Sequence, residues 1–350
     1  MAKKVRVGII GSGGIAQGQH MPAYQKDPDV EIVAVCDSNE ATAKKAAEQF
    51  KVPRIYTDYR ELARDKDIDA VSVCTPNFMH EKPTVACLEN GKHVMVEKPI
   101  ARNAKEGAAM VRAAKKNKRI LAVGLHMRYS PNVQAIKRFA DAGGLGDVYY
   151  ARIQAIRRRG IPSWGVFGDK EKQGGGPLID IGVHILYATM YVLDFPKPKA
   201  VCGATYTKFG NKPPGPAPWG PWDYKHFTVE DYAAAFIRFE GDLTATLEAS
   251  FAANTQESWN FWLLGDKGGA QLEPCTFYRD EFGTLTNTTP GWLPKGDEYV
   301  SEIRDFLAAV RGEGKPGVTG EQGLMVTQVL DGIYLSAERG AEIKLEALKV

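Results

Sequence analysis

The sequence has few cysteines and a small net charge, and each of these features argues against a class of protein. The five cysteines among 350 residues are scattered without paired spacing, so neither a disulfide framework nor a zinc motif is indicated. The six histidines form no ligand pair, and we expect no metal site. The formal net charge is only +3, with acidic and basic residues interspersed, so composition does not favour nucleic acid as a partner.

Long apolar runs are also absent. No stretch approaches the roughly 20 consecutive apolar residues that a membrane-spanning helix needs, so we expect no membrane partner. Residues 1–4 lead directly into a β-branched run, without the pattern of a signal peptide. Together with the scattered cysteines, this predicts a cytoplasmic protein.

Strand and helix patterns alternate along the first third of the chain. Apolar runs predict strands at 5–10, 30–36, 70–74, 93–97 and 120–124, with helices between them. This alternation predicts an α/β domain over residues 1–125, with a doubly wound parallel sheet of Rossmann type. Later strand patterns follow one another and alternate apolar with polar residues, so we expect an α+β domain over residues 126–350 with a large, open, mostly antiparallel sheet. The last predicted helix, near 320–339, is apolar enough to pack on either domain.

A glycine-rich turn follows the first predicted strand and reads Gly11-Ser12-Gly13-Gly14-Ile15-Ala16. This G-x-G-x-x-A pattern at the start of a helix is typical of a pyrophosphate-binding turn. The second strand ends at Asp37, about 20 residues beyond the turn, where a carboxylate accepts the ribose hydroxyls of a dinucleotide. Asp37 would repel a 2′-phosphate and Ser38 offers no positive charge, so we expect NAD rather than NADP.

A lysine follows the strand predicted at 93–97, in the tripeptide Glu97-Lys98-Pro99. The carboxyl end of a parallel strand borders the crevice where open α/β sheets bind ligands. Pro99 restricts Lys98 to an extended backbone, which fixes the direction of its side chain. Since Glu–Lys pairs are common on surfaces, the tripeptide alone also fits an ordinary turn.

Residues 174–184 read Gly-Gly-Gly-Pro-Leu-Ile-Asp-Ile-Gly-Val-His. Asp180 and His184 are four residues apart, so they share one face of a helix. The three glycines before them would let the chain approach a ligand closely. A histidine beside a carboxylate suits proton transfer from an alcohol at neutral pH. The same pattern also fits a capped helix with two polar residues on its solvent face.

Together these motifs resemble the Gfo/Idh/MocA family of sugar and cyclitol oxidoreductases. The resemblance covers nearly the whole chain, and further matches are Thr75-Pro76-Asn77 with His80, and residues 128–131. It implies a two-domain fold, a nicotinamide cofactor, and a catalytic trio of Lys98, Asp180 and His184. We expect His184 to accept the hydroxyl proton, Lys98 to stabilise the developing alkoxide, and Asp180 to hold a neighbouring hydroxyl.

The resemblance and the strand ends also imply binding residues. We expect the cofactor to contact Gly11, Ser12, Gly13, Gly14, Ile15, Asp37, Ser38, Thr75, Pro76, Asn77, His80, Glu97, Lys98 and Arg128. We expect the substrate to contact Lys98, Tyr129, Arg158, Trp164, Asp180 and His184. Two of these positions keep a structural alternative: the run Arg157-Arg158-Arg159 also fits a charged sheet edge, and Trp164 also fits ordinary packing.

The sequence therefore predicts an NAD-dependent oxidoreductase that transfers a hydride between nicotinamide and a ring hydroxyl of a sugar, sugar derivative or cyclitol. Two alternatives stay open: a redox-neutral glycosidase or eliminase that uses NAD transiently, and a non-catalytic sugar-sensing regulator on the same fold. The bare sheet face, in a family of dimers and tetramers, predicts a homodimer or homotetramer formed through the C-terminal sheet.

Overall fold

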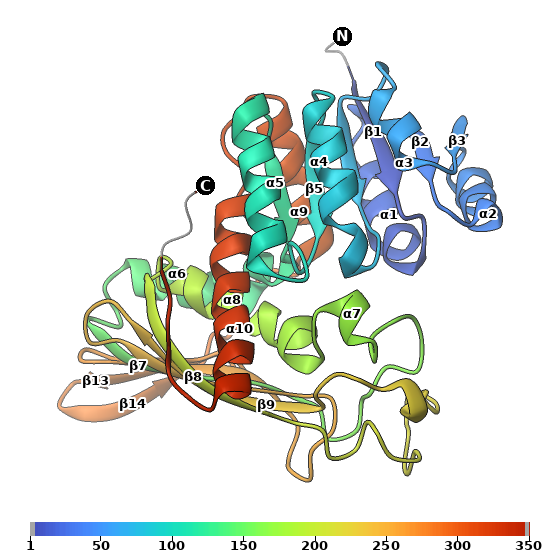
Figure 1. Cartoon of the computed structure of the whole chain (residues 1–350). Coiled ribbons are helices and arrows are strands. Elements are labelled where there is room, and N and C mark those ends of the chain that lie inside the picture. Colours follow the sequence, from blue (N-terminus) through green and yellow to red (C-terminus); the bar gives the residue numbers. More distant parts are fainter. Residues whose placement is uncertain (1–3, 347–349) are drawn as a thin grey trace. The chain divides into compact units, whose positions relative to one another are not determined.

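The computed structural model describes residues 4–346 and 350, which form two compact units (Figure 1). The first unit contains residues 4–126 and Asp297–Met325, and the second contains Met127–Gly296 and residues 326–346. The first unit thus includes a C-terminal segment in addition to the N-terminal residues that we expected in it. No helix in the described part of the chain is long and apolar enough to cross a membrane.

The first unit is built on a six-stranded parallel sheet with the order β3-β2-β1-β4-β5-β6. This is the Rossmann order, and it confirms the predicted fold class. The strands are β1 (Val5–Ile10), β2 (Val30–Cys36), β3 (Arg54–Tyr56), β4 (Ala70–Val73), β5 (His93–Glu97) and β6 (Leu121–Gly124). All except β3 are almost entirely buried, as expected for strands covered on both faces. Strand β3 escaped prediction because its three residues are only partly buried.

Helices connect these strands, and asparagine or aspartate side chains begin several of them. Asn39, Asp58 and Asn103 accept hydrogen bonds from backbone N–H groups at the starts of α2, α3 and α5, which satisfies donors that a helix leaves free. The helices of this segment are α1 (Met21–Gln25), α2 (Glu40–Phe50), α3 (Tyr59–Arg64), α4 (Glu81–Glu89) and α5 (Ala104–Asn117).

Two C-terminal helices lie between residue 297 and the last strand: α9 (Glu298–Val310) and α10 (Gly320–Arg339). Helix α9 lies wholly within the first unit. Its apolar residues share one core with the helix that follows β1 and with β1 and β2; the α9 members are Val300, Ile303, Phe306 and Leu307. This C-terminal helix therefore completes the hydrophobic core of the N-terminal sheet.

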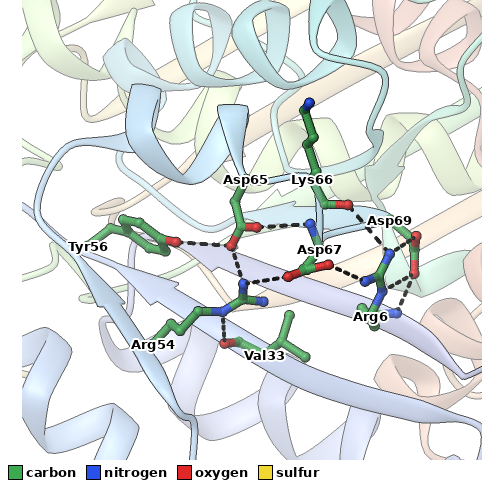
Figure 2. A network of polar contacts seen from close by, with 8 residues as sticks. All are labelled: Arg6, Val33, Arg54, Tyr56, Asp65, Lys66, Asp67 and Asp69. Atoms are coloured by element: carbon green, nitrogen blue, oxygen red, sulfur yellow. Dashed lines mark hydrogen bonds and ion pairs between the residues drawn. The ribbon is translucent and has the colours of Figure 1, made fainter.

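A network of ion pairs lies at the amino ends of these strands (Figure 2). Arg6 binds Asp69 through two hydrogen bonds of 3.0 Å each and reaches Asp67 at 2.8 Å. Arg54 pairs with Asp65 at 2.6 Å. The network fastens the loop that precedes β4 to β1 and β3. Because ligands bind at the carboxyl ends of parallel strands, its role at the opposite edge is structural.

The second unit contains a nine-stranded sheet with the order β14-β13-β12-β11-β7-β10-β9-β8-β15. Its pairings among the described residues are antiparallel except that of β7 with β10, which is parallel. This confirms the expected mostly antiparallel sheet. The strands are β7 (Val148–Ile156), β8 (Pro198–Tyr206), β9 (Tyr232–Phe239), β10 (Thr244–Ser250), β11 (Ser258–Gly265), β12 (Gly269–Gln271), β13 (Thr276–Glu281), β14 (Thr284–Thr288) and β15 (Ile343–Lys344).

Helices α6 (Pro131–Asp141) and α8 (Val183–Val192) lie on one face of this sheet (Figure 1). Along β10 the buried residues Ala245, Leu247 and Ala249 alternate with the partly exposed Thr244, Thr246 and Glu248. The period of two that the sequence shows therefore separates a covered face from a solvated one. A short helix, α7 (Lys170–Gln173), comes before the glycine run.

Candidate active site

The glycine turn after β1 is packed against neighbouring backbone at Gly11 and has free space beside Gly13 and Gly14. Gly11 has a φ of +84°, and a Cβ there would lie 2.7 Å from the carbonyl carbon and oxygen of Cys74, so this position requires glycine. A Cβ on Gly13 or Gly14 would meet no atom within 4 Å. The backbone there, at the start of the helix that carries Ile15, leaves room for a pyrophosphate group to approach. These residues fit a dinucleotide.

Asp37 stands at the end of β2 with its carboxylate held in place. One oxygen accepts a hydrogen bond from the backbone N–H of Ser12 at 3.0 Å, and the other accepts one from Asn39 at 2.9 Å. Asp37 is half-buried and Ser38 is exposed. The carboxylate is thus fixed beside the glycine turn, where it fits ribose hydroxyls and disfavours a 2′-phosphate.

The loop after β4 is tied to the loop after β5 by His80. Its two ring nitrogens lie 2.8 Å and 2.7 Å from the backbone carbonyl oxygens of Pro99 and Thr75. The ring is buried, and both of its nitrogens are occupied by the protein's own backbone. His80 thus positions these two loops, and its expected contact with the cofactor stays a prediction. Thr75 and Asn77 lie on the loop that His80 holds, where Thr75 Oγ1 donates to the carbonyl of Met79 at 2.7 Å.

Glu97 also faces the protein interior. Its Oε1 accepts a hydrogen bond from His20 Nε2 at 2.8 Å, and its Oε2 accepts one from the backbone N–H of Lys98 at 3.0 Å. Burial opposes ionisation of this carboxyl group, but the hydrogen bond and the charge of His20 lower the pKa of Glu97 below its usual range. Glu97 thereby fixes the backbone that carries the Lys98 side chain, and its expected contact with the cofactor stays a prediction.

Lys98 is half-buried and precedes a cis peptide bond to Pro99. His126, at the end of the first unit's main segment, stacks on Tyr299 with ring centroids 4.3 Å apart. Burial lowers the pKa of His126 to about 4. The negative charge of Glu97 opposes this shift, whereas the positive charge of Lys98 adds to it. A neutral imidazole therefore lies within electrostatic range of Lys98 at neutral pH. The sequence analysis missed both His20 and His126 because neither belongs to a recognised motif.

In the second unit, Asp180 and His184 lie on consecutive helical segments. Asp180 belongs to a π-helical turn, Leu178–Gly182, and His184 lies in the first turn of α8. Single π-helical turns inside helices are frequent at functional sites. Both side chains are 7% exposed, so the alternative of two polar residues on a solvent face is wrong.

The start of this helix is held by a buried carboxyl group. Glu230 accepts hydrogen bonds from the backbone N–H groups of Gly176 at 2.9 Å and Leu178 at 3.1 Å. A Cβ on Gly176 would lie 2.1 Å from the Glu230 carbonyl oxygen, and one on Gly175 would lie 2.0 Å from the Tyr334 hydroxyl. Both positions therefore require glycine for packing within the protein, and the expected close approach of this run to a ligand stays a prediction.

The run Arg157-Arg158-Arg159 begins just after β7 ends at Ile156. The alternation of side chains along a strand therefore does not decide which way each arginine side chain points. Arg158 is exposed, and its backbone N–H donates to Glu257 at 3.1 Å. Arg157 instead lies with its guanidinium carbon 4.4 Å from the centre of the Trp219 ring. Burial lowers the pKa of Arg157, whereas the negative charge of Asp180 acts in the opposite direction. Arg157 therefore lies within electrostatic range of Asp180, and the expected contact of Arg158 with the substrate stays a prediction.

Several aromatic residues surround the helix that carries His184. The guanidinium of Arg128 lies 4.1 Å over the Tyr191 ring and donates to the Tyr187 hydroxyl at 3.4 Å. This contact holds Arg128 against α8. The ring of Trp259 lies 6.2 Å from that of His184, and no sequence motif indicated this neighbour. Tyr129 and Trp164 also lie in this unit, half-buried and exposed respectively. Among the described residues, no group of three or more potential ligands could hold a metal ion.

Comparison with known proteins identifies the chain's relatives. The oxidoreductase family model with an NAD-binding Rossmann fold, GFO_IDH_MocA, matches residues 5–125, and the family's C-terminal domain matches residues 133–271. The chain is 37% identical to D-glucoside 3-dehydrogenase of Escherichia coli (strain K12) over 343 residues, covering 97% of each chain. It is 27% identical to levoglucosan dehydrogenase of Pseudarthrobacter phenanthrenivorans, covering 96% of this chain and 97% of that one.

A solved structure of levoglucosan dehydrogenase in complex with NADH shares the fold. It aligns with a TM-score of 0.86 at 22% identity and covers 99% of this chain and 100% of the other. The two family matches lie on the two predicted domains in the expected order. They confirm the resemblance inferred from the motifs and the expected NAD-binding Rossmann fold. The chain is therefore an oxidoreductase of the Gfo/Idh/MocA family.

Proposed function

We propose that the protein is an NAD-dependent dehydrogenase that oxidises a ring hydroxyl of a glucoside. The observation that carries this proposal is the 37% identity, over 97% of both chains, to a D-glucoside 3-dehydrogenase. The presence of Lys98, Asp180 and His184 supports a catalytic role over the non-catalytic sensor.

The cofactor would be held by the glycine turn of residues 11–16 and by Asp37. The open space at Gly13 and Gly14 supports pyrophosphate binding, and the fixed carboxylate of Asp37 supports binding of the adenosine ribose. When bound, the nicotinamide ring accepts the hydride. The protein's own side chains transfer the hydroxyl proton and position the substrate.

Oxidation of a secondary alcohol also removes the hydroxyl proton. His184 accepts this proton, because imidazole is the side chain best suited to accept a proton near neutral pH. Lys98 stabilises the negative charge that develops on the oxygen, and Glu97 keeps its backbone in place. Asp180 holds a neighbouring hydroxyl and so orients the reacting carbon.

A substrate panel tests the proposal. Methyl glucosides, free glucose, inositols and uronates would be incubated with the protein and NAD or NADP, and the absorbance of the reduced nicotinamide followed. We expect NADH formation with glucosides, and nuclear magnetic resonance of the product would show which ring carbon became a ketone. Turnover of inositols alone, or release of the aglycone without net NADH, would contradict the proposal.

We also propose that two or four copies of the chain associate through the solvated face of the nine-stranded sheet. This face carries partly exposed aromatic and hydroxyl side chains; among them are Tyr150, Tyr232, Phe236, Thr246 and Trp262. Symmetric contacts are the commonest way in which such a surface is covered, and a stable one buries more than ~1,000 Å². Light scattering at micromolar concentration should give a dimer or tetramer mass that Phe236→Glu lowers. A monomeric wild type would refute this assembly.

A cytoplasmic location goes with this function. The five cysteines form no disulfide in the structure, and four of them are buried. Unpaired cysteines are typical of proteins kept in a reducing compartment.

A further inference from the structure

We propose that Trp164 and Trp219 form a subsite for a ring carried on the anomeric oxygen of the glycoside substrate. Together with Arg157, we call these residues the tryptophan platform. The inference rests on the proposed function and adds to it the part of the substrate next to the oxidised sugar. All three residues belong to the second unit.

The platform presents apolar rings to solvent. Trp164 is 56% exposed and Trp219 is 40% exposed. Their ring centroids are 5.7 Å apart and their planes differ by 33°. These adjacent rings expose apolar surface to water, and a ligand that covered this surface would gain binding free energy. A pyranose or an aryl group has a flat apolar face of similar width, so either could stack on these rings.

The rings are held in position by the protein. The guanidinium of Arg157 lies 4.4 Å from the centre of the Trp219 ring and 5.6 Å from that of the fully buried Phe251. The hydroxyl of Ser163 donates to the backbone carbonyl of Trp219, which joins the loop that carries Trp164 to the loop that carries Trp219. Because these contacts form without a ligand, a stacking ring would meet a surface that needs little further ordering.

Arg157 links the platform to the candidate catalytic residues. It interacts electrostatically with Asp180 on one side and packs on the Trp219 ring on the other. Strand β10 joins the two regions: the backbone N–H of Arg157 donates to the carbonyl of Ser250 at 2.9 Å, and a Cβ on Gly182, in the turn that carries Asp180, would lie 3.3 Å from that of Ala249. Because Trp219 packs on the Arg157 side chain, the rings are placed to contact a group next to the oxidised sugar rather than that sugar itself. In a glucoside, such a group is the aglycone.

Kinetics with matched substrates test this assignment. The variants are Trp164→Ala, the conservative Trp164→Phe, and Trp292→Ala, a control at another tryptophan, 78% exposed, of the same unit. The substrates are methyl glucoside, 4-nitrophenyl glucoside and a glucosyl disaccharide, assayed with saturating NAD. An aromatic stacking contact corresponds to roughly a 2- to 12-fold change in affinity. We expect Trp164→Ala to raise KM by this factor for the ring-bearing glucosides only, with kcat unchanged.

The controls separate the possible results. Trp164→Phe should recover most of the affinity, and Trp292→Ala should behave as the wild type. A larger effect on the nitrophenyl glucoside than on the disaccharide would identify an aryl aglycone, and the reverse would identify a second sugar. An equal effect of Trp164→Ala on methyl glucoside, or none on any substrate, would overturn the subsite.

Calorimetric titration distinguishes failure of the subsite from failure of the proposed function. If the wild type oxidises no glucoside, the proposed function is wrong. The same ligands would then be titrated into the NAD-bound protein, where Trp164→Ala must weaken binding of the ring-bearing glucosides and not of methyl glucoside. If the two classes of ligand weaken equally or bind unchanged, the platform is not an aglycone subsite.

Discussion

Glu302, on helix α9, is a buried carboxyl group whose replacement should stabilise the protein. Glu302 is 2% exposed, and neither of its carboxyl oxygens has a hydrogen-bond partner among the residues that the structure describes. Burial, and then the negative charge of Glu97, raise the pKa of Glu302 well above its usual range. The folded protein therefore favours the protonated side chain, and folding above the ordinary pKa of glutamate is coupled to proton uptake.

The size of the effect follows from the missing partners. A polar group buried without a hydrogen bond costs about 1–3 kcal/mol of folding free energy. Glu302→Met removes this cost and keeps a long, flexible side chain in the same space, so we expect the free energy of unfolding to rise by about 1–3 kcal/mol at neutral pH. For a unit of this size, each kcal/mol corresponds to about 2–4 °C in melting temperature.

The dependence on pH gives a sharper test. The unfolded chain loses the Glu302 proton near its ordinary pKa of ~4.3, whereas the folded chain keeps it to a higher pH. Between these two values the folded state binds more protons, so the wild type loses stability as the pH rises. Glu302→Gln cannot titrate but keeps a buried polar group. Its advantage over the wild type should therefore be small near pH 4 and grow toward neutrality.

Thermal and urea unfolding, followed by tryptophan fluorescence, would measure these differences from about pH 5 to pH 8. The matched control is Glu313→Gln, at an exposed position just after the same helix, which should leave stability nearly unchanged. If Glu302→Met lowers the melting temperature at neutral pH, the carboxyl group makes stabilising contacts and the reasoning fails. If Glu302→Gln raises the free energy of unfolding by the same amount at every pH, the raised pKa of Glu302 is contradicted.

Three further predictions concern the cofactor and the catalytic residues. Gly11→Ala places a Cβ 2.7 Å from the backbone of Cys74 at a φ of +84°, and this strain of roughly 1–3 kcal/mol should weaken NAD binding in a fluorescence titration; an unchanged Kd would contradict it. Asp37→Ala should narrow the preference for NAD over NADP when both are titrated, and tighter NADP binding by the wild type would exclude our cofactor assignment. Lys98→Ala and His184→Ala should each lower kcat by ~10²–10⁴-fold while NAD still binds. Near-normal turnover by His184→Ala would assign the base to Lys98 or to water.

The features that the sequence predicted well are local. The turn after β1 and Asp37 lie within one strand–helix–strand unit, so spacing alone places the carboxylate beside the backbone of Ser12, to which it hydrogen-bonds. The buried strands β1, β2, β4, β5 and β6 carry continuous apolar runs, which report burial directly. By contrast, β14 is mostly exposed and polar, and it has no periodic signal to detect.

The contacts that local patterns did not predict depend on partners distant in sequence. Glu97 turns inward because His20, 77 residues earlier, offers it a hydrogen bond. The glycine run adjoins Tyr334 on α10, a contact that no local pattern encodes. Arg157 and Arg158 are adjacent in sequence, and only the position of Trp219 shows which of them packs inward. Motifs therefore located the candidate site, but the direction of each side chain required the tertiary structure.

The contribution of α9 to the first unit has a consequence for synthesis on the ribosome. The core around Met21 and Tyr24 includes Phe306 and Leu307, which are translated only after the whole of the nine-stranded sheet except β15. At ribosomal rates of about 5–20 residues per second, the apolar surface that α9 covers stays open for roughly ten to forty seconds. During that interval we expect chaperones to bind the exposed apolar surface of the nascent chain. A Rossmann domain cut at residue 125 would keep this surface permanently, so an isolated version should stay soluble only with α9 fused to its end.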